Sequence, residues 1–195
     1  MNSEIDLYLA SQSPRRRELL TQIGVRFATL SVDVPEQRRE GETPESYVTR
    51  LARDKAQAGA VVKQDKPVLG SDTIVVLNGK VLEKPASAEE GITMLLALSG
   101  QVHQVMTAVC LHHNGREQVR LNTTSVRFRS IQLQEAQRYW RTGEPADKAG
   151  GYGIQGLGAV FVDSINGSYS AVVGLPLLET SQLLHAFRIP VWQLD

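Results

Sequence analysis

The chain has little cysteine, no surplus of charge of either sign and no long apolar run. Its 195 residues contain one cysteine, Cys110, so no internal disulfide can form, as is usual in a reducing cytoplasm. Lys and Arg together number 21, and so do Asp and Glu, so net charge does not indicate nucleic-acid or anionic-membrane binding. No apolar stretch reaches the length of a membrane span, about 18 residues. The sequence predicts a cytoplasmic protein in which any positive site is local.

Hydrophobic periodicity and turn signals predict interleaved strands and helices. Strands are expected at 7–10, 25–32, 68–84, 102–128 and 160–162. Helices are expected at 14–24, 44–62, 88–98, 132–140 and 176–187. Asn78-Gly79 and Asn114-Gly115 are strong hairpin signals within two of the strand segments. The expected fold class is α/β, with a mixed twisted sheet and flanking helices in a single domain, 1–195.

Consecutive arginines follow a Ser-Pro pair in the stretch "LASQSPRRREL". Ser13 is a favourable N-cap, and Pro14 suits the first helical position. Arginines there oppose the helix macrodipole, while the unpaired N–H groups of a first turn attract anions. Together, Arg15, Arg16 and these N–H groups would form an anion site for which phosphate is the natural ligand. A solvated basic turn or a nucleic-acid contact are the alternatives at this point.

Four further charged residues have both a structural and a functional interpretation, or a structural one alone. Lys55 lies at the edge of a helical apolar stripe, where it either points inward or snorkels to solvent. Lys84, before a proline, by itself indicates only an exposed turn. Asp72 interrupts the apolar run "VLGSDTIVVL", so it marks a strand end, a bulge or a site. Beside a phosphate site, Asp72 and the loop residue Glu36 would suit a divalent cation and water activation; simple solvation is the alternative for Glu36.

Two other patterns do not indicate sites. Gly151–Gly156, "GYGIQG", matches GxGxxG, but a polar loop precedes it and a strand is expected after it. A dinucleotide fingerprint needs a strand before and a helix after, so that interpretation is rejected. The glycines are expected instead to let backbone approach a ligand closely. The four histidines and Cys110 lack zinc-site spacing.

Four stretches in order resemble the Maf family of nucleoside triphosphate pyrophosphatases, also called septum-formation inhibitors. They are "LASQSPRRREL", "GSDTIVVLNGKVLEKP", "LSGQVHQVMTAV" and "DKAGGYGIQGLGAVFVDSINGSYSAVVGLPL". The resemblance runs from about Leu7 to Phe187. It implies an elongated α/β fold similar to the inosine triphosphate pyrophosphatases, with two lobes around one central nucleotide-binding cleft. It also implies a divalent metal cation, Mg²⁺ or Mn²⁺, and frequently a homodimer.

The resemblance assigns the cations to the phosphates of a nucleotide. Ser13, Arg15 and Arg16 match the positions that hold the triphosphate. Lys55 and Lys84 match positions that add positive charge over the same phosphates. The resemblance therefore favours the phosphate-site interpretation of the helix start over a solvated turn.

The resemblance assigns the carboxylates to catalysis. Asp72 matches the catalytic carboxylate, which accepts a proton from water, and Glu36 matches a loop acid beside the substrate that assists the metal or the water. Both are therefore implied metal ligands. Pro35 stands where relatives often have a second acid, so the loop here has only Glu36. Attack at the α–β phosphoanhydride would give a nucleoside monophosphate and pyrophosphate.

Three substrate-binding positions resemble the branch of the family that acts on dTTP and UTP. They are Arg16, Thr73 and Gln155. The sister branch, which acts on 7-methyl-GTP, typically has a tryptophan directly after the Ser-Pro pair, a glutamine after the aspartate and a Ser-Glu pair in place of Ile154-Gln155; none of these is present here. The amide of Gln155 can both donate and accept, which suits the edge of a pyrimidine. The expected activity is hydrolysis of dTTP and UTP, and of modified pyrimidine nucleotides related to them.

The alternative from another class is a nucleotide-binding regulator of cell division that acts through a protein partner. Asp72 discriminates against it, because a carboxylate beside a triphosphate repels the ligand unless a cation intervenes. A nucleic-acid binder is disfavoured by the balanced charge and by a basic patch confined to one helical turn.

Overall fold

The structure is a computed structural model that describes residues 5–193. Its strands are β1 (Leu7–Leu9), β2 (Phe27–Thr29), β3 (Val68–Leu77), β4 (Lys80–Leu82), β5 (Val102–His113), β6 (Arg116–Phe128) and β7 (Val162–Asn166). They form one sheet in the order β2-β1-β3-β5-β6-β7, with β4 paired to β3. β1 pairs in parallel with β2 and β3, whereas the β3–β4 and β6–β7 pairs are antiparallel. The mixed α/β fold class is therefore confirmed.

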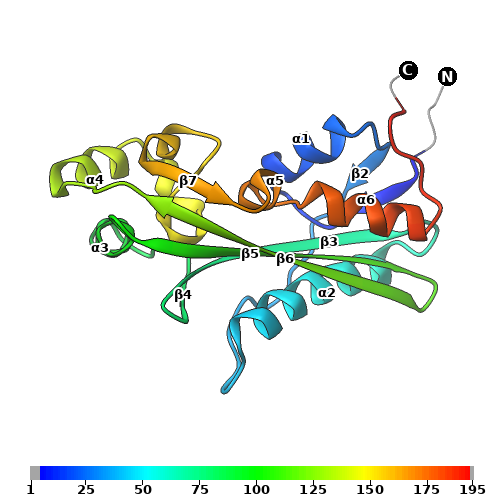
Figure 1. Cartoon of the computed structure of the whole chain (residues 1–195). Coiled ribbons are helices and arrows are strands. Elements are labelled where there is room, and N and C mark those ends of the chain that lie inside the picture. Colours follow the sequence, from blue (N-terminus) through cyan, green and yellow to red (C-terminus); the bar gives the residue numbers. More distant parts are fainter. Residues whose placement is uncertain (1–4, 194–195) are drawn as a thin grey trace. The chain divides into compact units, whose positions relative to one another are not determined.

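Six α-helices and three short 3₁₀ helices accompany the strands in the described part of the chain (Figure 1). The α-helices are α1 (Pro14–Gln22), α2 (Pro44–Val62), α3 (Ala88–Leu98), α4 (Leu133–Trp140), α5 (Tyr169–Val173) and α6 (Leu177–Ala186). The 3₁₀ helices are η1 (Glu144–Asp147), η2 (Ala149–Gly151) and η3 (Leu157–Phe161). Within 5–193, no helix is long and apolar enough to cross a membrane.

The chain divides into two compact units. The first unit comprises 1–72, 107–122 and 174–195, and the second comprises 73–106 and 123–173. Because β3, β5 and β6 each begin in one unit and end in the other, neither unit is a continuous piece of chain.

The predicted helix starts and hairpin turns are confirmed. The hydroxyl oxygens of Ser13, Thr43 and Ser87 each accept a hydrogen bond from the backbone N–H three residues later. At both Asn-Gly turns, asparagine and glycine have positive φ: 49° and 75° at Asn78-Gly79, and 49° and 74° at Asn114-Gly115. Positive φ at both residues is the requirement of a type I′ turn, which these two residue types satisfy most easily.

The strand predicted at 160–162 is wrong. Residues 157–161 form η3, and β7 begins only at Val162. The carboxylate of Glu144 accepts hydrogen bonds from the backbone N–H groups of Leu157 and Gly158, at 2.8 and 2.9 Å. These bonds hold the start of η3. Across the predicted strand the backbone turns, because the N–H of Ala159 donates to the carbonyl oxygen of Gly156 and the N–H of Val162 donates to that of Ala159. Helix α5 was also not predicted; the Ser168 hydroxyl accepts from the N–H of Ala171 near its start.

Close packing of α2 on β3 depends on a glycine in the first unit. A Cβ placed on Gly70 would lie 2.3 Å from the carbonyl oxygen of Ala52 and 2.6 Å from the backbone nitrogen of Ala56. Both neighbours are backbone atoms of α2, so only a residue without a Cβ fits there. This contact sets the position of the α2 turn that carries Lys55, relative to the strand that carries Asp72.

The core of the second unit contains a neutral histidine. His103 is 1% exposed, and its Nε2 lies 2.7 Å from the Tyr152 hydroxyl. Its ring makes edge-on contacts with the rings of Phe128 and Tyr152. Burial lowers the pKa of His103 from 6.5 to about 4. The imidazole therefore stays uncharged at neutral pH.

This histidine is expected to make stability fall in mild acid. The unfolded chain takes up a proton at His103 near pH 6.5, whereas the folded chain does so only near pH 4. The contribution of neutral His103 to the free energy of unfolding is thus fully present above pH 6.5 and is lost as the pH falls toward 4. The loss amounts to about 3 kcal/mol. Urea unfolding at pH 7 and pH 4.5 should show a smaller loss in His103→Gln than in the wild type. Equal losses in both proteins would contradict the assignment.

Candidate active site

The start of α1 carries unbalanced positive charge in the first unit. Its first turn contains no acidic residue, and Ser13 caps it by accepting from the backbone N–H of Arg16 at 3.5 Å. Arg15 and Arg16 are half-buried, whereas Arg17 is exposed. The turn on which the predicted anion site depends is thus present, with two arginines in it, and the binding of an anion there stays a prediction.

Arg16 is fixed by the chain itself. Its Nε donates to the carbonyl oxygen of Gly174 at 2.8 Å, and its Nη1 donates to the hydroxyl of Ser11 at 3.3 Å. The buried hydroxyl of Ser71 donates to the same carbonyl at 3.2 Å. Burial lowers the pKa of Arg16, while the charges of Asp72 and Glu36 oppose that shift. Arg16 is therefore a held cation within electrostatic reach of both predicted carboxylates.

Lys55 lies between the two carboxylates. Its Nζ is 2.5 Å from Oδ1 of Asp72 and 2.6 Å from Oε1 of Glu36. Lys55 is 8% exposed and Asp72 is 7% exposed, whereas the side chain of Glu36 is 41% exposed. The inward orientation of Lys55 is thus the observed one, and a buried carboxylate has the partner that its burial requires. In this structure the contacts of its ammonium are carboxylates, whereas the resemblance implies phosphates.

The loop that carries Glu36 is tied to α2. The Tyr47 hydroxyl donates to the backbone carbonyl of Glu36 at 2.9 Å, and Arg50 donates to that of Gln37 at 3.0 Å. Arg50 also forms a bidentate pair with Glu42, with Nε–Oε1 at 2.6 Å and Nη2–Oε2 at 2.9 Å. Bidentate arginine–carboxylate pairs are geometrically specific. A loop with few apolar residues therefore keeps Glu36 near Lys55.

The other predicted residues belong to the second unit. Thr73 is half-buried and directly follows Asp72 in β3. Lys84 is exposed after β4, and Gln155 is exposed in the turn between η2 and η3. The first unit thus contains the residues at the start of α1 and the contact of Lys55 with Glu36 and Asp72, whereas Thr73, Lys84 and Gln155 belong to the second.

The glycine-rich segment is not a dinucleotide fingerprint. Gly151–Gly156 begins at the last residue of the 3₁₀ helix η2 and ends directly before the 3₁₀ helix η3, so it does not lie between a strand and an α-helix. A Cβ on Gly156 would lie 2.2 Å from Oε2 of Glu144, and one on Gly158 would lie 2.6 Å from the Tyr139 hydroxyl. The groups that lie close to these glycines in the structure are therefore side chains of the protein itself.

Glu144 and Tyr139 are the residues that sequence reasoning missed. Both lie before the glycine-rich segment, and Glu144 stands in the polar stretch "RTGEPADK", where an acidic residue is unremarkable. Only the spacing of glycines at 153, 156 and 158 pointed to something large against that backbone.

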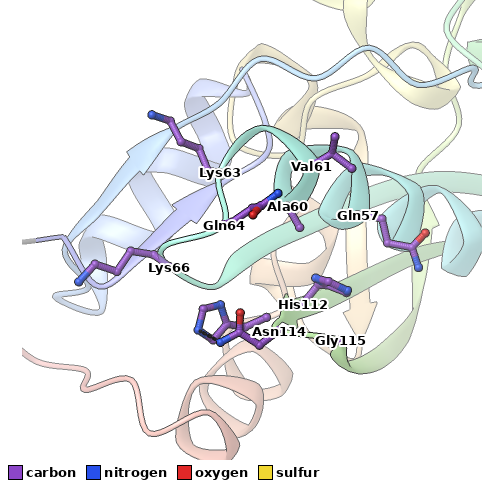
Figure 2. Close-up of a pocket in the computed structure, with 10 residues that line it drawn as sticks. Gln57, Ala60, Val61, Lys63, Gln64, Lys66, His112, Asn114 and Gly115 are labelled. Atoms are coloured by element: carbon purple, nitrogen blue, oxygen red, sulfur yellow. Dashed lines mark hydrogen bonds between the residues drawn. The ribbon is translucent and has the colours of Figure 1, made fainter.

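A surface pocket of about 430 Å³ lies elsewhere in the first unit. Figure 2 shows the last turns of α2, with Gln57 and Val61, beside the β5–β6 turn, with His112 and Asn114. None of the predicted site residues lines this pocket, and no carboxylate does. Its position therefore does not coincide with the convergence of Lys55 and Asp72.

Comparison with known proteins identifies the family. The profile described as Maf-like protein matches residues 6–187, so the chain belongs to the Maf family. A dTTP/UTP pyrophosphatase of Saccharophagus degradans is 64% identical over 98% of this chain and 93% of its own length. A dTTP/UTP pyrophosphatase of Aliivibrio fischeri is 55% identical over 94% of this chain and 99% of its own length. One of Shigella sonnei is 58% identical over 93% of this chain and 93% of its own length. The sequence-based resemblance is thus confirmed.

Proposed function

We propose that the protein is a cytoplasmic nucleoside triphosphate pyrophosphatase acting on dTTP and UTP. The observation that carries the proposal is the buried Asp72, paired with Lys55 and within electrostatic reach of the basic start of α1. Its relatives named dTTP/UTP pyrophosphatase, matched along nearly their whole length, support the same activity. Water would attack the α-phosphorus, the bond from that phosphorus to the bridging oxygen would break, and pyrophosphate would leave with a nucleoside monophosphate.

In this proposal the first turn of α1 binds the triphosphate. Pro14 has no N–H and that of Arg16 already donates to Ser13, so the proposed donors are the N–H of Arg15 and the guanidinium groups of Arg15 and Arg16, which also supply the positive charge. The anchoring of Arg16 at Gly174 and Ser11 means that its charge is already in place before substrate arrives. Such preorganisation lowers the cost of stabilising charge on the reacting phosphates.

Asp72 is the proposed proton acceptor for the attacking water. The carboxylate is nearly buried, which limits competing contact with bulk solvent, and it pairs directly with the ammonium of Lys55. Thr73, Lys84 and Gln155 are proposed as further substrate contacts: Lys84 for phosphate, and Thr73 and Gln155 for the nucleoside. The amide of Gln155 can complement the donors and acceptors on a pyrimidine edge.

A divalent cation, Mg²⁺ or Mn²⁺, is the proposed cofactor. Two carboxylate oxygens, from Asp72 and Glu36, converge within 2.6 Å of one ammonium, so they can share a cation. Mg²⁺ is typically bound by one or two carboxylates plus substrate phosphates, and this donor set fits that pattern. The ion would offset the negative charge of the triphosphate at the carboxylates. Lys55, repelled by a divalent ion at the same oxygens, is proposed to turn to the phosphates.

The test is a nucleotide panel with purified protein and Mg²⁺ or Mn²⁺. The panel contains dTTP, UTP, CTP, dATP, GTP and 7-methyl-GTP, with pyrophosphate and orthophosphate assayed separately. Pyrophosphate release from dTTP and UTP would establish the reaction, the cleaved bond and the branch. Binding of dTTP without turnover of any nucleotide would overturn the proposal and favour a regulatory binder.

Chelation is expected to separate activity from stability. With EDTA, turnover of dTTP should fall at least about 100-fold and return when Mg²⁺ is added in excess. The thermal midpoint of the free protein should stay unchanged, because Lys55 already pairs with Asp72 and Glu36 without a metal. A large fall in the midpoint on chelation would contradict this role for Lys55, and full activity in EDTA would contradict the cofactor.

A further inference from the structure

The carboxylate of Glu144 binds three donors in the second unit. Its Oε1 accepts from the Tyr139 hydroxyl at 2.5 Å and from the backbone N–H of Gly158 at 2.9 Å. Its Oε2 accepts from the backbone N–H of Leu157 at 2.8 Å. Hydrogen bonds to an ionised acceptor are among the stronger ones in proteins. One side chain thus fixes the end of the segment 153–158.

Tyr139 fixes the beginning of the same segment. Its hydroxyl donates to Glu144 and accepts from the backbone N–H of Gly153 at 3.1 Å. Tyr139 is 5% exposed, and its ring contacts the ring of Phe161 edge-on, so the hydroxyl has little freedom to move. We call Glu144 and Tyr139, with their bonds to Gly153, Leu157 and Gly158, the Glu144–Tyr139 clamp.

The glycines of the segment are explained by this clamp. Cβ atoms on Gly156 and Gly158 would lie 2.2 Å from Oε2 of Glu144 and 2.6 Å from the Tyr139 hydroxyl. Neither glycine has a positive φ, so close approach, not backbone conformation, is what requires them. Gln155 stands between them and Gly153 on the exposed side of the turn.

The pKa values of Glu144 and Tyr139 favour the protonation states that these hydrogen bonds need. Burial would raise the pKa of Glu144, but the hydrogen bonds from Tyr139, Gly158 and Leu157 outweigh it, and the pKa is lowered. Burial and the bond to Glu144 raise the pKa of Tyr139. At neutral pH, an ionised acceptor therefore meets a protonated phenol.

We propose that Glu144 and Tyr139 are positioning residues that hold the segment 153–158 in one conformation and thereby fix Gln155 for the pyrimidine base. The role of Gln155 rests on the proposed function, whereas the holding of the segment rests on the hydrogen bonds alone. As a positioning residue, Glu144 would touch no reacting atom. Its effect on substrate passes through the backbone from Leu157 and Gly158 to Gln155.

The first test needs no substrate. Amide hydrogen exchange of the free protein, followed by NMR, should speed up about 10- to 100-fold at Leu157 and Gly158 in Glu144→Ala. In Tyr139→Phe, which keeps the ring, the amide of Gly153 should speed up about 10-fold. Unchanged exchange at these three amides would overturn the clamp, as would an equal increase throughout the second unit.

A matched control is available on α4. The carboxylate of Glu135 also forms an ion pair in the second unit, with Arg129 at 2.8 Å, but none of its hydrogen bonds goes to the segment 153–158. Glu135→Gln should leave exchange at Gly153, Leu157 and Gly158 unchanged. Faster exchange there in the control would show that loss of any carboxylate loosens the segment, and the proposal would be overturned.

The second test asks whether the clamp acts through Gln155. Glu144→Ala and Gln155→Ala should each raise KM for dTTP about 10-fold while kcat stays within about threefold. The double variant should show no further rise, since a loosened segment and a missing amide lose the same contact. Multiplied effects in the double variant, or an unchanged KM in Glu144→Ala, would overturn the positioning role.

The two tests distinguish a failure of the proposed function from a failure of the clamp. If the wild type turns over no nucleotide, the proposed function fails, and amide exchange still decides whether the clamp holds the segment. If the wild type is active and Gln155→Ala has the KM of the wild type, the positioning of a base by this segment is overturned. Glu144→Asp, which keeps the charge on a shorter side chain, should recover part of the protection at Leu157 and Gly158.

Discussion

Replacing Asp72 with asparagine is expected to lower kcat for dTTP by about 10³-fold. The substitution keeps the shape of the side chain but removes the proton acceptor and one of the two proposed metal ligands. Lys55 retains Glu36 at 2.6 Å, so the loss of stability should be limited to about 2 kcal/mol. Turnover at saturating dTTP, together with urea unfolding of the same preparation, would separate the two effects.

The matched control is an aspartate that is exposed to solvent. Asp163, exposed on β7, should tolerate asparagine with kcat within about twofold and stability within about 0.5 kcal/mol of the wild type. An Asp72→Asn protein that keeps more than about a tenth of the wild-type kcat would remove Asp72 from the chemistry.

Gly70→Ala is expected to destabilise the protein by about 3 kcal/mol or more. In a strand, alanine would ordinarily be the better residue, so propensity alone predicts the opposite sign. Here the new methyl group would meet the Ala52 carbonyl oxygen at 2.3 Å and the Ala56 nitrogen at 2.6 Å. Since both belong to the backbone of α2, the helix itself has to move, and Lys55 moves with it. Urea unfolding with comparison of m-values would measure the loss.

Gly115→Ala separates steric contact from backbone conformation. Gly115 has a φ of 74°, and a methyl group added to it would meet nothing within 4 Å, so only the conformational cost of about 1 kcal/mol applies. Gly70→Ala should therefore be clearly the less stable of the two variants. A Gly70→Ala protein as stable as the wild type would contradict the close packing of α2 on β3.

Local sequence signals were enough where the structure is set by neighbours in the chain. Ser13 before Pro14 specifies a helix start because the hydroxyl oxygen needs only an N–H three residues on. Asn114-Gly115 specifies a tight turn because both residues accept positive φ. The alternation of such signals along the chain was sufficient to predict a mixed sheet with helices.

Contacts between distant residues were beyond these signals. Lys55 is 17 residues from Asp72 and 19 from Glu36 in the sequence, and no local pattern states that one ammonium meets both carboxylates. The predicted strand at 160–162 was wrong for a similar reason: η3 begins at Leu157 and Gly158, whose N–H groups bind a side chain 13 and 14 residues earlier, and its turns continue to Phe161. The resemblance supplied the identities of the candidate site residues but not these pairings.

The division of the first unit into three stretches has a consequence for synthesis on the ribosome. The second unit has all its residues once 173 has been added, whereas the first unit still lacks 174–195, with the buried Leu183 and Leu184 of α6. Gly174, whose carbonyl anchors Arg16, belongs to that last stretch. A nascent chain can therefore complete the unit with Gln155 before the unit with Asp72. A nucleotide that met the growing chain before that point would find Arg16 without its bond to Gly174, with only the bond to Ser11 to hold it.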